Sequence, residues 1–116
     1  MAKILVIDDD LDVLEVVQLV LEHKGFEVMA SSNPLDVITK IEEGKPDAVL
    51  LDIQLGLMDG RDICRDVKKK YRDLPVILFS ANINYKTSFE EYEADGFIAK
   101  PFDIDMLADT LSLHIA

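Results

Sequence analysis

The chain alternates short apolar runs with longer amphipathic stretches along its whole length. The runs are too short for stable helices, and their continuous apolar character suits strands that are covered on both faces. They are Lys3–Ile7, Glu27–Ala30, Ala48–Leu51, Val76–Phe79 and Phe97–Ala99. Because strands that alternate with helices require right-handed crossover connections, the pattern predicts an α/β fold with a mostly parallel five-stranded sheet and helices on both faces.

The first stretch between these runs has the clearest helical periodicity. Leu14, Val17 and Leu21 recur at the spacing of one helix face. Valines lie beside this stripe at Val13, Val16 and Val20. The pattern predicts a helix over Leu11–Lys24 that buries a wide stripe and stops at Gly25.

The other stretches carry helix signals of different strength. Asn33 and Pro34 are typical of an N-cap and a first helical position, and they predict a helix that ends at Gly44. A third helix is expected to turn four side chains inward: Ile63, Cys64, Val67 and Tyr71. A fourth, weaker helix carries Tyr85, Phe89 and Tyr92 on one side. The last helix is expected to start at an Asp103 cap and to pass through Met106, Leu107 and Leu111 to the C-terminus.

Composition limits the size and the surroundings of the protein. With 116 residues, 49% of them hydrophobic, the chain suits one compact domain, which we expect to span residues 1–116 without an output domain. No apolar stretch is long enough to cross a membrane, and the single cysteine, Cys64, agrees with a reducing cytoplasm and a buried thiol. The net charge of −11 disfavours direct binding to nucleic acid or to anionic membranes.

Polar residues follow several of the predicted strands. Asp8 and Asp9 come directly after the first strand, Asp52 after the third and Lys100 after the fifth, and Ser80 follows the fourth. If these strands are parallel neighbours, three carboxylates and one ammonium group meet at one edge of the sheet. Carboxylates this close repel one another unless a divalent cation neutralises them, and Mg²⁺ suits such a site, with Mn²⁺ as an alternative ion.

This set of groups predicts phosphoryl transfer to a carboxylate. Asp52 is the natural nucleophile, and Lys100 and Ser80 would neutralise charge on the opposite side of the phosphoryl group. The aspartyl phosphate would add negative charge and strong acceptors, which would attract Ser80 and favour movement of Phe97.

Together, these motifs resemble those of a bacterial two-component response-regulator receiver domain of the chemotaxis-receiver type. The resemblance covers the whole chain. The matching motifs are Asp8-Asp9, Asp52, Met58-Asp59-Gly60, Ser80-Ala81 and Lys100-Pro101-Phe102. It implies a flavodoxin-like, doubly wound (βα)5 three-layer sandwich with strand order 2-1-3-4-5.

The resemblance also implies residue roles. Asp52 would be the phosphoacceptor, and the metal ligands would be Asp8, Asp9, Asp52 and the backbone carbonyl of Gln54. Lys100 would bind the phosphoryl group, and its bond to Pro101 would be cis. Ser80 and Phe97 would form the switch pair.

The resemblance further implies a signalling role with protein partners. A histidine kinase or histidine phosphotransfer protein would donate the phosphoryl group, and the face of the fourth helix, fifth strand and fifth helix would change for a downstream protein. The domain would take part in its own phosphorylation and dephosphorylation without being a multi-turnover enzyme. It would be a monomer or a phosphorylation-dependent dimer.

The chain departs from this family at two places. Gly56-Leu57 replaces a common Pro-Gly pair, and the segment from Ser80 to Lys100 is slightly short, which predicts a short or displaced fourth helix. Two other functions remain as alternatives. One is a haloacid-dehalogenase-like phosphatase with its signature at Asp10-Leu11-Asp12-Val13, although Asp10 also suits a helix cap. The other is a flavodoxin-like binding module.

Some other polar residues receive a structural interpretation. Lys68-Lys69-Lys70 with Arg72 resembles a nucleic-acid patch, but it falls at a predicted helix C-terminus, where cations offset the helix dipole. His23 and His114 have no partner at a metal-binding or catalytic spacing, so we assign them no role.

Overall fold

The structure is a computed structural model that describes residues 2–82 and 89–115. Its main sheet has five parallel strands in the spatial order β2-β1-β3-β6-β7. They are β1 (Lys3–Ile7), β2 (Glu27–Ser31), β3 (Ala48–Asp52), β6 (Val76–Ser80) and β7 (Gly96–Ala99). This arrangement confirms the predicted doubly wound fold and its strand order. Strands β4 (Gln54–Leu55) and β5 (Met58–Asp59) form a separate small hairpin, so β6 and β7 are the fourth and fifth strands of the main sheet.

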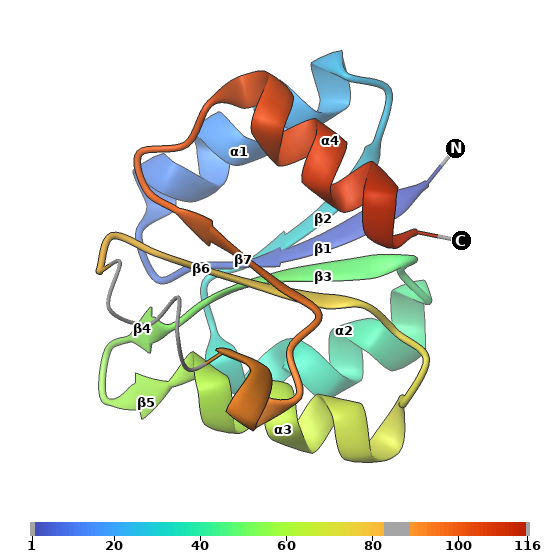
Figure 1. Ribbon diagram of the computed structural model, residues 1–116, viewed down its shortest axis with the longest axis vertical. Helices are drawn as coiled ribbons and strands as arrows, with labels where there is room; N and C mark the ends of the chain where they lie inside the picture. Colours follow the sequence, from blue (N-terminus) through green and yellow to red (C-terminus); the bar gives the residue numbers. More distant parts are fainter. Residues whose placement is uncertain (1, 83–88, 116) are drawn as a thin grey trace.

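Helices cover both faces of the sheet. The elements α1 (Leu11–His23) and α4 (Ile104–His114) lie on one face, and α2 (Val37–Gly44) and α3 (Gly60–Lys70) lie on the other (Figure 1). Within the residues that the structure describes, no helix is both long and apolar enough to span a bilayer. The sheet and the two layers of helices together form a three-layer sandwich.

Alternate side chains of the central strands pack into two separate hydrophobic cores, one on each face of the sheet. In β1, Leu5 and Ile7 pack toward α2 and α3, whereas Ile4 and Val6 pack toward α1 and α4. All four are fully buried, as the continuous apolar run predicts for a strand with two covered faces. The interior of the sheet is therefore apolar, and the buried polar residues that the structure describes, Asp8, Asp52 and Ser80, lie where strands end.

Several predicted boundaries and caps are confirmed. Helix α1 ends near Gly25, which has a left-handed φ of 94°, and α4 begins at Asp103, whose side chain accepts bonds from two backbone N–H groups. Asn33 caps the next segment, but its first turn, Pro34–Asp36, is a 3-10 helix, and α2 itself begins at Val37.

One exposed side chain corrects the predicted burial pattern. Val16 is 53% exposed because it lies on a part of α1 that the sheet does not cover, whereas Leu14, Val17 and Leu21 are buried. Met106 is likewise exposed on α4, and its neighbour Leu107 is fully buried.

The region after Asp52 contains a hairpin that the sequence did not predict. Strands β4 (Gln54–Leu55) and β5 (Met58–Asp59) pair antiparallel, and Gly56 has the left-handed φ of 62° in the turn between them. Leu57, at the tip of this hairpin, is fully exposed.

The predicted fourth helix is described only in part. Residues Phe89–Tyr92 form a 3-10 helix, η3, in place of the expected α-helix turn, and Tyr85 lies outside the described residues. Tyr92 packs its ring against α3, where the guanidinium carbons of Arg61 and Arg65 lie 4.7 and 4.5 Å from the ring centroid.

Candidate functional site

Three aspartates converge at the carboxyl edge of the sheet. Asp8 and Asp9 follow β1, and Asp52 is the last residue of β3. One carboxylate oxygen from each lies within 4.8 Å of the others. Asp8 and Asp52 are buried, whereas Asp9 is exposed, so the group forms a shallow site with one side open to solvent.

The parallel register explains why these side chains meet. Strand β1 pairs with β3 so that Ile7 lies beside Leu51, and the next residue on each strand is an aspartate. Strand β1 is also where the chain reverses its direction of winding, since β2 lies on one side of it and β3 on the other. Doubly wound sheets bind ligands at this point.

Lys100 brings a positive charge to the buried pair. Its Nζ lies 2.8 Å from Oδ2 of Asp8 and 3.4 Å from Oδ2 of Asp52. The backbone N–H of Lys100 donates to the carbonyl of Ser80 at 2.9 Å, and the peptide bond to Pro101 is cis. The ammonium group also lies 4.4 Å from the centroid of the Phe79 ring.

The electrostatics of Asp52 differ from those of a surface aspartate. Burial raises the pKa of its carboxyl to about 7; Lys100 opposes this rise and the nearby Asp8 carboxylate adds to it. One oxygen, Oδ1, accepts a hydrogen bond from the backbone N–H of Gln54 at 3.2 Å. The carboxylate is therefore destabilised in this setting, and a nearby cation would favour its charged form.

The donor set fits a hard divalent cation. Every ligand atom in the cluster is a carboxylate oxygen, and Mg²⁺ prefers one or two carboxylates with its remaining positions open to water and phosphate oxygens. The open side at Asp9 leaves room for such ligands. The role of the Gln54 carbonyl stays a prediction.

Ser80 and Phe97 lie on the two strands next to the site. Ser80 is fully buried at the end of β6, where its Oγ accepts a hydrogen bond from the backbone N–H of Asn82 at 3.1 Å. It pairs in register with Ala99, while Phe97 pairs with Leu78 and is half-buried. The proposed switch residues thus belong to adjacent strands, one at the edge of the site and one two positions behind it.

Asp10 has a structural role that differs from that of its neighbours. Its Oδ1 accepts hydrogen bonds from the backbone N–H groups of Asp12 and Val13, which makes it the N-cap of α1. The phosphatase interpretation needed Asp10 as the nucleophile, and this cap bonding uses that carboxylate to begin a helix.

Two lysines of the basic run and the single cysteine also have structural environments. Lys68 binds Asp95 and the Leu74 carbonyl, and Lys70 binds Glu42. The Cys64 thiol is fully buried, and burial raises its pKa to about 12, so it is a poor nucleophile.

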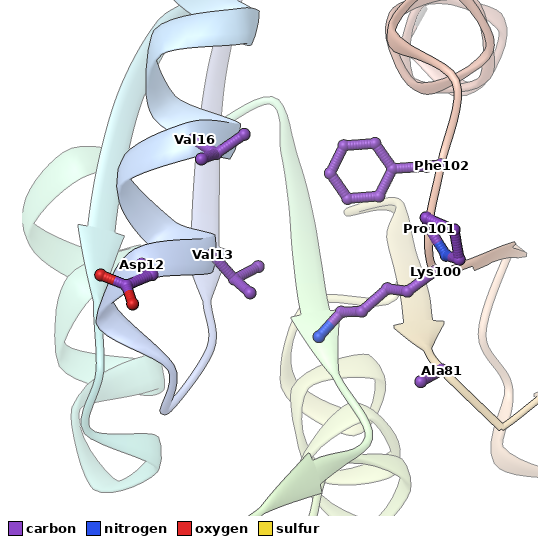
Figure 2. A pocket seen from close by; sticks show the side chains of 7 residues that line it. All are labelled: Asp12, Val13, Val16, Ala81, Lys100, Pro101 and Phe102. Atoms are coloured by element: carbon purple, nitrogen blue, oxygen red, sulfur yellow. The ribbon is translucent and has the colours of Figure 1, made fainter.

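The sequence did not reveal an apolar hollow next to the site. Its volume is about 510 Å³. Figure 2 shows Val13 and Val16 of α1 on one wall and Phe102 on the other, with the Lys100 side chain extending between them. The two walls come from opposite ends of the chain, so local sequence patterns could not have indicated the hollow.

Comparisons with known proteins agree with this geometry. Residues 4–112 match the family described as the response regulator receiver domain. The N-terminal signal receiver domain of a two-component response regulator from Bacteroides fragilis shares 34% identity, with a TM-score of 0.91 over 100% of this chain and 98% of that one.

A second similar structure was solved with a metal and a fluoride compound. The response regulator TrrA from Thermotoga maritima, in complex with Mg²⁺-BeF, shares 28% identity, with a TM-score of 0.92 over 99% of this chain and 100% of that one. A response regulator from Chloroflexus aurantiacus also shares 28% identity, with a TM-score of 0.90 over 97% of this chain and 96% of that one. The chain described here belongs to the response regulator receiver domain family, whose members are phosphoacceptor signalling domains.

Proposed function

We propose that Asp52 of this receiver domain accepts a phosphoryl group in a reaction that needs Mg²⁺ held by Asp8, Asp9 and Asp52. The convergence of three carboxylate oxygens within 4.8 Å, with Lys100 beside two of them, is the observation that supports this function best. When bound, Mg²⁺ supplies positive charge that offsets the phosphoryl oxygens and the carboxylates. The carbonyl of Gln54 would complete the protein's contribution to the ion.

The protein's own groups prepare Asp52 for attack. The N–H of Gln54 holds Oδ1, so Oδ2 is the oxygen that faces Lys100. Attack by a carboxylate oxygen forms the bond to phosphorus while the bond to the donor's leaving group breaks, and the leaving group departs with that electron pair. Lys100, freed from part of its interaction with Asp8, would then neutralise charge on the transferred group.

Ser80 and Phe97 would convert phosphorylation of Asp52 into a change of the protein surface. The new phosphoryl oxygens are strong acceptors, and the buried Ser80 hydroxyl is a donor at the end of the adjacent strand. Its movement would favour a new position for Phe97 and change the surface formed by η3, β7 and α4. A downstream protein would recognise that surface, either as a monomer complex or after the domain dimerises.

The apolar hollow offers a place where the phosphodonor can dock. Lys100 belongs both to the hollow and to the acidic site, so a protein seated against Val16 and Phe102 would hold its phosphohistidine close to Asp52. A histidine kinase or a histidine phosphotransfer protein fits this role. The domain would act within a single phosphoryl cycle and would not turn over free substrates.

The test is phosphoryl uptake from acetyl phosphate with Mg²⁺, measured by intact mass. We expect one phosphoryl group on the wild type, none on Asp52→Asn, and normal uptake by Asp10→Asn, because Asp10 only caps α1. Parallel reactions with Mn²⁺ and with a chelator define the ion. Loss of uptake in Asp10→Asn, or steady phosphate release from many small esters, would instead support the phosphatase function, which the family match does not support.

A further inference from the structure

The start of α3 approaches the phosphoacceptor strand more closely than a side chain allows. Gly60 is the first residue of α3 and is buried. A Cβ at this position would overlap the backbone carbonyl oxygen of Asp52 and lie 2.9 Å from both its carbonyl carbon and the Cα of Ile53. These are backbone atoms, which cannot rotate away, so any larger residue must displace α3 or the end of β3.

Hydrogen bonds hold the backbone after Asp52 from two sides. The N–H of Gly60 donates to the Ile53 carbonyl at 2.7 Å, and the N–H of Ile53 donates to the Phe79 carbonyl at 3.1 Å. Residue 53 is therefore held between α3 and β6. The next N–H along the chain, that of Gln54, is the one that binds Oδ1 of Asp52. The direction of this N–H, and with it the orientation of the carboxylate, depends on where α3 places residue 53.

The first turn of α3 is itself held by Asp59. Its Oδ1 accepts a hydrogen bond from the backbone N–H of Arg61 at 2.9 Å, and its Oδ2 lies 2.7 Å from the Arg61 guanidinium. Register pairing of Asp59 with Gln54 across the β4–β5 hairpin adds a second link to the same segment. The N-terminus of α3 is thus a fixed support for the residues that follow Asp52.

We propose that Gly60 is a positioning residue for phosphorylation: its lack of a side chain lets α3 hold the Ile53–Gln54 backbone so that the Asp52 carboxylate presents Oδ2 toward Lys100. The inference rests on the proposed role of Asp52 as phosphoacceptor. It gives the Gly60 of the Met58-Asp59-Gly60 motif a function that ligand binding does not explain.

The test compares Gly60→Ala with Gly44→Ala. Gly44 also lacks room for a Cβ, but the atoms in its way belong to the flexible side chain of Met29, away from Asp52. Uptake from acetyl phosphate is followed by intact mass at saturating Mg²⁺ and divided by the folded fraction from amide NMR spectra. We expect Gly60→Ala to react about tenfold more slowly or worse, and Gly44→Ala to stay within about twofold of the wild type.

A second readout separates positioning from a loss of structure. Asp8 and Asp9 follow another strand and still hold the ion in Gly60→Ala, whereas Asp52 and Gln54 are displaced, so we expect a lower maximal rate that saturating Mg²⁺ does not restore. A folded Gly60→Ala variant that reacts at the wild-type rate would overturn the inference. So would a slower rate that is fully restored by higher Mg²⁺.

If Gly60→Ala does not fold, Asp59→Ala tests whether the first turn of α3 positions the Asp52 carboxylate. This variant keeps the glycine but removes the side chain that holds the first turn, and we expect its maximal rate to fall about two- to fivefold. An unchanged maximal rate would contradict the inference. Failure of the wild type to take up any phosphoryl group would instead contradict the proposed function of Asp52, so the two failures are distinguishable.

Discussion

The interior of the central strands and their carboxyl ends differ sharply although they are adjacent in the chain. Leu50 and Leu51 of β3 are fully buried and apolar, and the next residue, Asp52, is almost equally buried but ionisable. The same step separates Ile7 from Asp8 on β1 and Phe79 from Ser80 on β6. Across the whole described chain, Asp8, Asp52 and Ser80 are the buried polar residues, and all three lie at this one edge.

Burial has opposite effects on stability in the strand interior and at the carboxyl edge. Burial of the apolar interior stabilises the fold by about 25 cal/mol for each Å² removed from water. Burial of Asp52 acts in the opposite direction, because its pKa is raised to about 7 and its charged form is disfavoured. The apolar interior therefore supplies the stability that offsets the unfavourable burial of a carboxylate at the edge.

The largest expected effect on stability comes from the interior. Leu50→Ala should lower the free energy of unfolding by about 2–5 kcal/mol, because Leu50 is fully buried and its truncation leaves a cavity in the core. Urea denaturation measures this change, and Leu35→Ala, at a side chain that is 75% exposed, is the control with an expected change of about 0.5 kcal/mol or less. Equal losses in the two variants would break the contrast between covered and uncovered positions.

At the edge, removing a charge should stabilise the fold. The pKa of Asp52 is about 7 in the folded protein and 3.8 as its ordinary value, so between these pH values the folded state holds a proton that the unfolded state has lost. Stability from this group is therefore greatest below about pH 4 and declines as pH rises to about 7. In chelator, Asp52→Asn should raise the free energy of unfolding by about 1–3 kcal/mol at pH 8, and by clearly less at pH 5.

Denaturation at the two pH values measures this gain, with Asp109→Asn on the surface of α4 as the control. Adding Mg²⁺ at pH 8 should stabilise the wild type and leave Asp52→Asn nearly unchanged, because the ion favours the charged carboxylate. A variant that is less stable than the wild type at pH 8 in chelator would show that Lys100 outweighs burial and the repulsion from Asp8.

The smallest effect is expected at the start of α4, outside the strand interior and the acidic cluster. Asp103→Ala removes an N-cap whose Oδ1 accepts bonds from the N–H groups of Asp105 and Met106, and it should cost about 1 kcal/mol. Thermal unfolding measures the loss, with Asp103→Asn as a variant that keeps a capping oxygen and most of the stability. Phosphoryl uptake at Asp52 should not change, and a large fall in uptake would mean that this cap also supports the site.

The elements that sequence reasoning located depend on short-range signals. The apolar runs of β1, β3 and β6 stand out because both faces of these strands are covered, and Asp10 and Asp103 are recognisable caps because each has a helix directly after it. The convergence of Asp8 with Asp52 could be expected once the strands were taken as parallel neighbours, since both residues follow them directly.

The features that were missed depend on contacts between distant segments. Val16 looked like part of a buried stripe, but it is exposed and lines a hollow whose other wall includes Phe102, a residue distant in the sequence. The closer approach of Lys100 to Asp8 than to Asp52, at 2.8 against 3.4 Å, likewise depends on the path of the chain after β7. The Met58-Asp59-Gly60 motif marked this glycine, but nothing in the sequence indicated its close approach to the Asp52 backbone.

Locating the phosphoryl group is the most direct test of the central claim that these carboxylates form one metal-dependent acceptor site. The protein is treated with acetyl phosphate in Mg²⁺ or in chelator, the acyl phosphate is reduced with borohydride, and the modified residue is identified by peptide mass spectrometry. The proposed mechanism predicts modification at Asp52 alone and only with the metal. Modification at another residue, or equal modification of Asp52 in chelator, would contradict it.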